Sequence, residues 1–361
     1  MHNLGNNSYF GGLVTDRRLD EGGGGTTFGV DANLRFWKNF LFTGQIVGSN
    51  TQEMNDPERS SRLEGRTFDD GRYTATLDGE TFSGLAYTAE IDYNSRYWFW
   101  EVGYESLSPT FRADNGFINQ NNDRTLFLFN GFAIYPEGIQ FIDSIRPRFF
   151  ALRSWNFDGL QKNNIFSPGV FMEMKGQTRM FAGYRFRQET FAGAEFDGLN
   201  SFEFFASTNF TQYFQIGSEV SIGKSIARNL GDPEIGNSTN ISAFATIRPT
   251  DRLRISPQFS YSRLEDRQTG EAFFDGYIAR TRINYQFSRR FFLRTVVQYN
   301  DFAERLEIDP LLTYRINPFT AFYIGSTHRL DTFPGQMQDD PSFLQESQRQ
   351  FFFKFQYLLR R

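Results

Sequence analysis

Apolar and polar residues alternate along most of this chain with a period of two. Residues 253–262 show the pattern most clearly, because every second position is apolar: Leu253, Ile255, Pro257, Phe259 and Tyr261. Successive side chains of a β-strand point to opposite faces of the sheet, so this segment is predicted to be a strand with one apolar and one polar face. Segments 28–36, 214–222 and 277–287 repeat the pattern, and no segment of useful length has a helical period.

The connections between these segments are of two alternating kinds. Short turns are predicted at 37–39, 94–96, 175–177, 211–213, 249–251, 288–290 and 317–318. Longer polar stretches are predicted at 19–25, 53–80, 108–122, 156–164, 189–199, 226–237, 265–275 and 331–347.

Alternation of short and long connections is typical of bacterial outer-membrane barrels, which have short periplasmic turns and longer extracellular loops. The predicted fold class is therefore all-β: a transmembrane antiparallel up-and-down β-barrel of about 18 strands. Residues 1–361 are expected to form this single barrel, with both termini in the periplasm.

Composition favours a membrane barrel over a soluble β-sandwich, which is the competing interpretation. Aromatic residues make up 18% of the chain although its mean hydropathy is −0.50 and 22% of its residues are charged. No run of apolar residues approaches the length that a spanning helix needs. Aromatic residues also gather beside the short turns, at 36–37, 97–100, 213–214 and 291–292, as in the aromatic girdle of a barrel.

Several classes of function are disfavoured by the residues that are rare or absent. The chain has no cysteine, which removes thiolate metal sites and cysteine nucleophiles. A net charge of −4 argues against a nucleic-acid partner, and no cofactor is expected. Because no secretory signal follows Met1, we expect that a signal peptide and a preceding N-terminal domain are absent from this chain.

The last segment resembles the terminal strand signal that the outer-membrane barrel assembly machinery reads. Alternate positions carry Phe351, Phe353, Phe355, Tyr357 and Leu359. The departure from that signal is the final pair, Arg360 and Arg361, in place of a terminal aromatic residue. The expected partners are thus outer-membrane lipid, the assembly machinery and a periplasmic or surface protein.

A second resemblance covers both ends of the chain. Segments 9–17 and 28–36, and the closing segments 299–302 and 312–315, are similar to the barrel of a Bacteroidetes-type family of unknown function. In that family a carbohydrate-binding family 9-like domain commonly precedes the barrel. The resemblance implies an exported outer-membrane product, and it is the sole basis for expecting a saccharide cargo.

Charged residues fall on the non-lipid face of the predicted strands. On the lipid face each Arg or Lys at the midplane would cost about 2–4 kcal/mol, so these residues are expected to face the lumen. The selected lumen-facing residues are Glu90, Asp92, Glu101 and Glu105 on strands 4 and 5, and Arg254, Arg280, Arg282 and Arg294 on strands 13 to 15. In a ring of about 18 strands these groups would stand nearly opposite and set up a transverse field. Pairing with neighbours to brace the interior is the alternative.

Candidate chemistry is sparse. His328, in the segment 326–331, could serve as the base of a surface hydrolase if an acidic or hydroxyl partner lies within reach, although a solvated or lumen-facing histidine is the expected state. Acidic residues at 69–70 and at 78–80 could offer oxygen ligands to calcium, although solvation is the expected state and no metal site is assigned. No catalytic residue is assigned either.

Three functions follow from these observations. The leading hypothesis is a passive or gated conduit with a charged lumen, and no enzymatic activity. The second is a non-conducting anchoring or assembly barrel that binds partner proteins. The third is an outer-membrane surface hydrolase built around His328.

Overall fold

A computed structural model of the chain describes residues 2–5, 7–20, 22–332 and 344–358. Over these residues the chain is all-β, with twenty-two strands and two short 3₁₀-helices, η1 (Pro57–Leu63) and η2 (Asp301–Ala303). Eighteen of the described strands have ten or more residues, and each is long enough for a tilted membrane strand. This confirms the predicted count of about 18.

Twenty of the described strands follow one another along one sheet in antiparallel pairs, and β5 and β6 pair in a small sheet of their own. The first half comprises β1 (His2–Gly5), β2 (Ser8–Arg18), β3 (Gly24–Phe36), β4 (Phe40–Gln52), β5 (Thr67–Phe68), β6 (Tyr73–Thr74), β7 (Thr81–Asn94), β8 (Trp98–Leu107), β9 (Asp123–Phe132), β10 (Ile142–Trp155) and β11 (Gln161–Met174). The second half comprises β12 (Thr178–Phe191), β13 (Ala194–Phe196), β14 (Ser201–Thr211), β15 (Phe214–Ala227), β16 (Glu234–Thr250), β17 (Leu253–Glu265), β18 (Ala272–Gln286), β19 (Phe291–Asn300), β20 (Arg305–Asn317), β21 (Thr320–Thr332) and β22 (Leu344–Tyr357).

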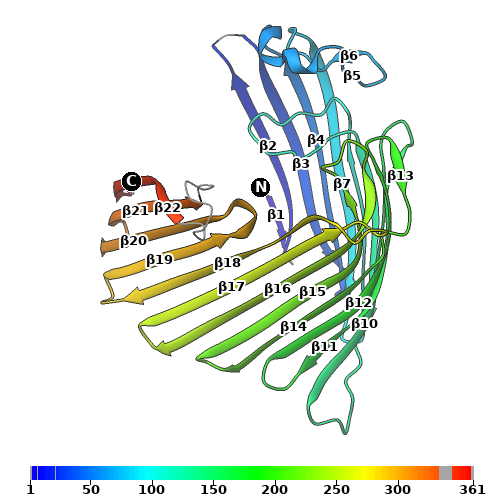
Figure 1. The fold of residues 1–361 in the computed structure, drawn as a ribbon. Helices are drawn as coiled ribbons and strands as arrows, with labels where there is room; N and C mark the ends of the chain where they lie inside the picture. The colour runs from blue at the N-terminus through cyan, green and yellow to red at the C-terminus, as the bar shows by residue number, and fades with distance from the viewer. Residues whose placement is uncertain (1, 6, 21, 333–343, 359–361) are drawn as a thin grey trace. The chain divides into compact units, whose positions relative to one another are not determined.

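Contacts along the chain group the residues into two compact units. Unit 1 comprises Met1–Ile134, Arg146–Gly169 and Arg185–Gly198, and unit 2 comprises Tyr135–Ile145, Val170–Tyr184 and Leu199–Arg361. In unit 1, β5, β6 and η1 belong to the long connection between β4 and β7 and lie beyond the ends of those strands (Figure 1).

The predicted alternation of connections is confirmed. Seven short connections of two to four residues lie at the predicted turns, whereas the connection at 133–141, which joins β9 to β10 on the same edge, has nine residues. The longest connection among the described residues runs from 53 to 80, as predicted. Part of the predicted loop 331–347 lies outside the described residues. No helix in the described part of the chain is long and apolar enough to cross a membrane.

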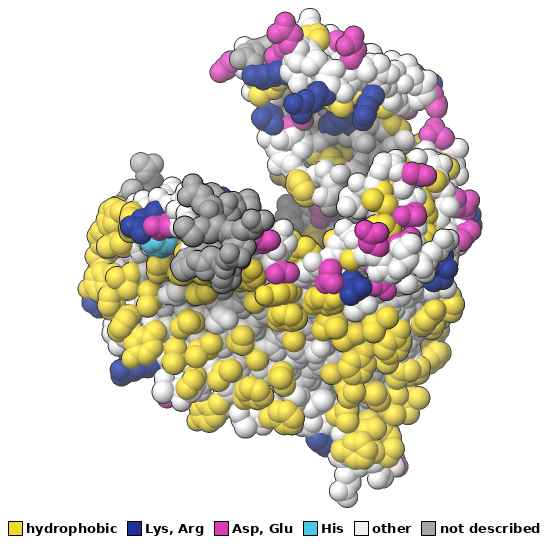
Figure 2. Space-filling view, in the orientation of Figure 1, with side chains coloured by type: hydrophobic (Ala, Val, Ile, Leu, Met, Phe, Trp, Pro, Cys, Tyr) yellow, Lys and Arg dark blue, Asp and Glu magenta, His cyan; other side chains and the backbone are white. Residues whose placement is uncertain are grey.

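Cross-strand pairing confirms the predicted apolar and polar faces. Directly paired residues share a face, and Ile255 pairs with Ile283 while Phe259 pairs with Ala279. Many large apolar side chains on this face are exposed, which suits a surface that meets lipid rather than water. Figure 2 shows such side chains gathered over the strands from β14 to β19.

The terminal strand follows the same rule. Phe351, Phe353, Phe355 and Tyr357 lie on one face of β22, and they are exposed, as is almost the whole of this strand. The fifth residue of that pattern, Leu359, lies outside the described residues. Recognition by the assembly machinery stays a prediction.

Alternation is blurred at β8 and β9 because phenylalanine also occupies the polar face. Phe127 pairs with Gly103, and a Cβ atom at Gly103 would lie 2.2 Å from the Phe127 Cζ atom. The glycine therefore leaves the space over which the ring lies. Phe99 lies over Gly131 in the same way. Sequence periodicity cannot show such filling, since it depends on the neighbouring strand.

Reversing the polarity of one face tests the assignment of the lipid surface. Phe259→Arg places a guanidinium at the centre of β17 on the apolar face, so the free energy of unfolding in lipid vesicles is expected to fall by about 2–4 kcal/mol. Ser242→Arg is the matched control, because Ser242 pairs with Glu219 on the polar face. Chemical denaturation measures both variants, and equal losses would show that the faces are assigned wrongly.

Candidate functional site

Arginines converge on the polar face of unit 2 near the short-turn ends of its strands. Arg254 on β17 pairs with Asn284 on β18, and Asn284 pairs with Arg294 on β19. Arg282 lies two residues before Asn284, on the same face of β18. The register of the strand pairing therefore brings together Arg254, Arg282 and Arg294, which are far apart in the sequence.

These side chains line one cavity of about 580 Å³. Its arginines are Arg248, Arg252, Arg254, Arg282, Arg289, Arg294 and Arg315, and Asp251 is the acidic residue among its lining. Guanidinium groups stay charged in proteins, so this excess of cations makes the cavity strongly electropositive.

Two of the arginines have contacts that hold them at the cavity. Arg248 donates a hydrogen bond from Nη1 to the carbonyl oxygen of Gln212 at 2.8 Å. The Arg315 guanidinium lies 5.6 Å from the centre of the Phe292 ring. Because guanidinium groups bind carboxylate and phosphate through paired N–H donors, the cavity can bind an anionic group.

Part of this site was predicted from the sequence. Arg254, Arg282 and Arg294 line the cavity, whereas Arg280 lies farther along β18, opposite Gln258 and Gln298, and does not. Arg248, Arg252 and Arg289, which flank or lie in the short turns, were missed as site residues. Their signal was present, since turns at one edge of a barrel meet at one end of the lumen.

A carboxylate cluster forms on the polar face of unit 1. Asp92 on β7 pairs directly with Glu101 on β8, and Glu90 lies two residues before Asp92. Carboxylate oxygens of these three residues lie within 4.8 Å of one another, so they create a negative potential that attracts cations. Glu105 pairs with Thr88 and Thr125 and is outside the cluster. The transverse field between the acidic and basic groups stays a prediction.

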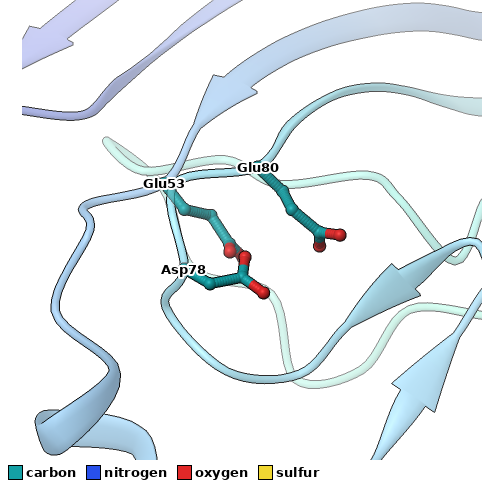
Figure 3. A group of neighbouring side chains, drawn as sticks. All are labelled: Glu53, Asp78 and Glu80. Carbon is teal, nitrogen blue, oxygen red and sulfur yellow. The ribbon is translucent and has the colours of Figure 1, made fainter.

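Another carboxylate cluster lies in the long connection of unit 1. Glu53, Asp78 and Glu80 have carboxylate oxygens within 4.8 Å of one another (Figure 3). Thr74 positions two of them, because its backbone N–H donates to Glu80 at 2.9 Å and its hydroxyl donates to Asp78 at 2.8 Å. The residues predicted at 69–70 do not join this cluster, and Asp69 instead pairs with Arg72.

Burial dominates the ionisation of Glu53. Burial, together with the nearby charges of Glu80 and Asp78, raises the pKa of this carboxyl to about 7. The Arg112 guanidinium opposes the shift. Arg112 is itself held by the aromatic rings of Phe68 and Phe82, 5.1 and 5.3 Å from its guanidinium carbon. The Glu53 carboxyl therefore titrates close to neutral pH.

His328 has both kinds of partner that a hydrolase would need. Its Nε2 atom lies 3.0 Å from the Ser326 hydroxyl, and its Nδ1 atom lies 2.9 Å from a Glu346 carboxylate oxygen.

Comparison with known proteins gives matches only in structure. No protein-family model and no curated protein matches the chain. The siderophore receptor PirA from Acinetobacter baumannii is 10% identical with a TM-score of 0.51, over 85% of this chain and 58% of the receptor. A mutant ferric enterobactin receptor from Pseudomonas aeruginosa is 9% identical with a TM-score of 0.53, over 87% of this chain and 59% of that one.

The copper transporter OprC is similar over a larger share of its length. It is 12% identical with a TM-score of 0.53, over 96% of this chain and 68% of that chain. Identities this low show the fold alone: the chain is an all-β, antiparallel up-and-down sheet of the outer-membrane β-barrel class. It spans less than two thirds of the two receptors. The resemblance to a Bacteroidetes-type family stays a prediction.

The raised pKa of Glu53 predicts that the connection 53–80 is most stable in acid. The folded carboxyl binds its proton more tightly than the unfolded one, whose pKa is 4.5. Stability is thus greatest below about pH 4.5 and falls as pH rises to about 7. Hydrogen exchange of these amides, corrected for intrinsic rates, should show several-fold weaker protection at pH 8 than at pH 5.

Glu53→Gln should remove this pH dependence, because the amide does not titrate. Glu58→Gln, at an exposed position in η1, is the matched control and should retain it. A Glu53→Gln protein whose protection still falls with pH would contradict the assignment.

Proposed function

We propose that this chain is an outer-membrane conduit whose arginine-lined cavity selects anionic solutes. Both termini lie in the periplasm in this proposal, since an even number of strands returns the chain to its starting side and short turns face the periplasm. The cavity of unit 2 is the observation that carries it. Arginine rings in pores attract anions and repel cations.

The names of the structural matches also favour a function in transport. The matched proteins are described as a siderophore receptor, an enterobactin receptor and a copper transporter. What those proteins bind or carry is not assigned to this chain, because the likeness is one of fold alone. A saccharide cargo rests on the family resemblance, and a saccharide that carries carboxylate or phosphate would satisfy both the resemblance and the arginines.

Planar bilayer recordings test this conduit. In a potassium chloride gradient, the reversal potential of the wild-type protein should show preference for chloride. The triple variant Arg254→Gln, Arg282→Gln, Arg294→Gln removes three charges from the cavity, so the chloride-to-potassium permeability ratio is expected to fall at least about threefold.

Arg267→Gln is the matched control because Arg267 is exposed in the connection after β17, at the opposite strand end. It should leave the ratio unchanged, and a heat-modifiability gel checks that each variant is folded. Unchanged selectivity in the triple variant would contradict the arginine filter. Absence of conductance in the folded wild type would instead favour the anchoring barrel.

A further inference from the structure

A chain of three polar side chains links the middle of β21 to the beginning of β22. Ser326 Oγ lies 3.0 Å from His328 Nε2, and His328 Nδ1 lies 2.9 Å from Glu346 Oε1. Both ring nitrogens thus have a partner, with a hydroxyl on one side and a carboxylate on the other. This is the order of groups that activates a serine nucleophile: hydroxyl, imidazole and an acid that orients the imidazole.

A β-bulge places the acid in this chain. His328 pairs with Arg349 and Arg329 pairs with Gln348, but Leu330 pairs with Glu346, so that Ser347 is the extra residue. In regular alternation, Glu346 would point to the face opposite His328. The bulge returns it to the same face, and bulges often re-aim a side chain in this way beside active sites.

Arg349 holds the carboxylate in position. Its Nε atom donates to Glu346 Oε1 at 2.8 Å, and its Nη2 atom donates to the second oxygen, Oε2. Charge-assisted hydrogen bonds of this kind orient a carboxylate more firmly than neutral ones. Glu346 is therefore fixed where it can orient the His328 ring and balance the charge of a protonated imidazole.

These polar groups lie on the apolar face of the strands. Ile324 and Phe353 form a cross-strand pair next along this face and are 57% and 65% exposed. Phe351, which pairs with Ser326, is 70% exposed, and its ring meets the His328 ring edge-on at 6.0 Å. Polar groups on a lipid-facing surface cost free energy even when they are paired, so a polar cluster at this place is a candidate functional site.

We infer that Ser326, His328 and Glu346 form a hydrolase site for the acyl esters of membrane lipids. In this site Ser326 is the nucleophile, His328 is the general base and then the general acid, and Glu346 is the positioning residue. The inference does not depend on the conduit, because it concerns the lipid face rather than the lumen.

The proposed reaction is hydrolysis of the acyl ester, with water as the second substrate. Ser326 Oγ attacks the ester carbonyl carbon while its proton moves to His328 Nε2. The tetrahedral intermediate collapses, the bond to the alcohol oxygen breaks, and His328 returns the proton to that oxygen. Water then attacks the acyl-serine ester, gives one proton to His328 and releases the fatty acid, and the Ser326 oxygen takes the proton back.

The residues around Ser326, His328 and Glu346 indicate the class of substrate. An acyl chain can lie along Phe351 and Phe353, while the Arg349 guanidinium, half-exposed beside the site, can meet an anionic headgroup. Ser326 is only 8% exposed, which favours a thin lipid ester over a folded protein substrate. A glycerophospholipid acyl ester fits both ends of this site.

A fluorophosphonate probe tests the nucleophile directly, because it labels serines that a neighbouring histidine activates. The wild-type protein in detergent micelles should be labelled and should release fatty acid from vesicles of phosphatidylethanolamine and phosphatidylglycerol. Ser326→Ala and His328→Ala should each lower both signals at least about 1000-fold. Glu346→Gln should lower the rate less, and its pH profile should shift because the amide carries no charge to balance a protonated imidazole.

Ser260→Ala is the control, since Ser260 lies on β17 and contacts Ser242 rather than a histidine. It should keep full labelling, and heat-modifiability gels show which variants are folded. Persistence of labelling in folded Ser326→Ala would overturn the assignment. So would a folded wild-type protein that is neither labelled nor active on the vesicles, and the three residues would then serve only to satisfy one another's hydrogen bonds.

Discussion

Backbone hydrogen bonding between neighbouring strands is the constraint on which the rest of this structure depends. In hydrocarbon there is no water to satisfy an N–H or C=O group, so each strand must take its partners from the strands beside it. The antiparallel ladders also fix register, and register decides which residues share a face. A slip of one residue between β17 and β18 would move Ile283 and Ala279 from the lipid face to the polar face.

Register also creates the charged sites. Arg254, Asn284 and Arg294 stand in one row across three strands because two ladders align them. Asp92 and Glu101 are brought together by a third ladder in the same manner. Each strand contributes only one or two of these charges. The electropositive or electronegative surface forms when neighbouring strands pair and place their charges side by side.

Two departures from the regular alternation of polar and apolar faces have local causes. Glycine at 103 leaves room for the Phe127 ring on a face that is otherwise polar. The extra residue Ser347 turns Glu346 toward His328 on a face that is otherwise apolar. In both cases a rule of alternation is broken by one residue. At Glu346 the consequence is chemical, since it completes a hydrogen-bonded chain from carboxylate to hydroxyl.

The sequence by itself determined the class of fold, the approximate number of strands, most of the turns and the face of each regularly alternating strand. These features depend on residues close together in the chain, so a period of two and the residues of a turn are enough to indicate them. It also singled out Arg254, Arg282 and Arg294, because their parity is local. Only the tertiary structure decided that Arg280 stands apart from the cavity, that Arg248 and Arg252 join it, and that His328 has Ser326 and Glu346 as partners. Those outcomes depend on pairing between strands and on one bulge, and the spacing of residues within a single strand carries no record of either.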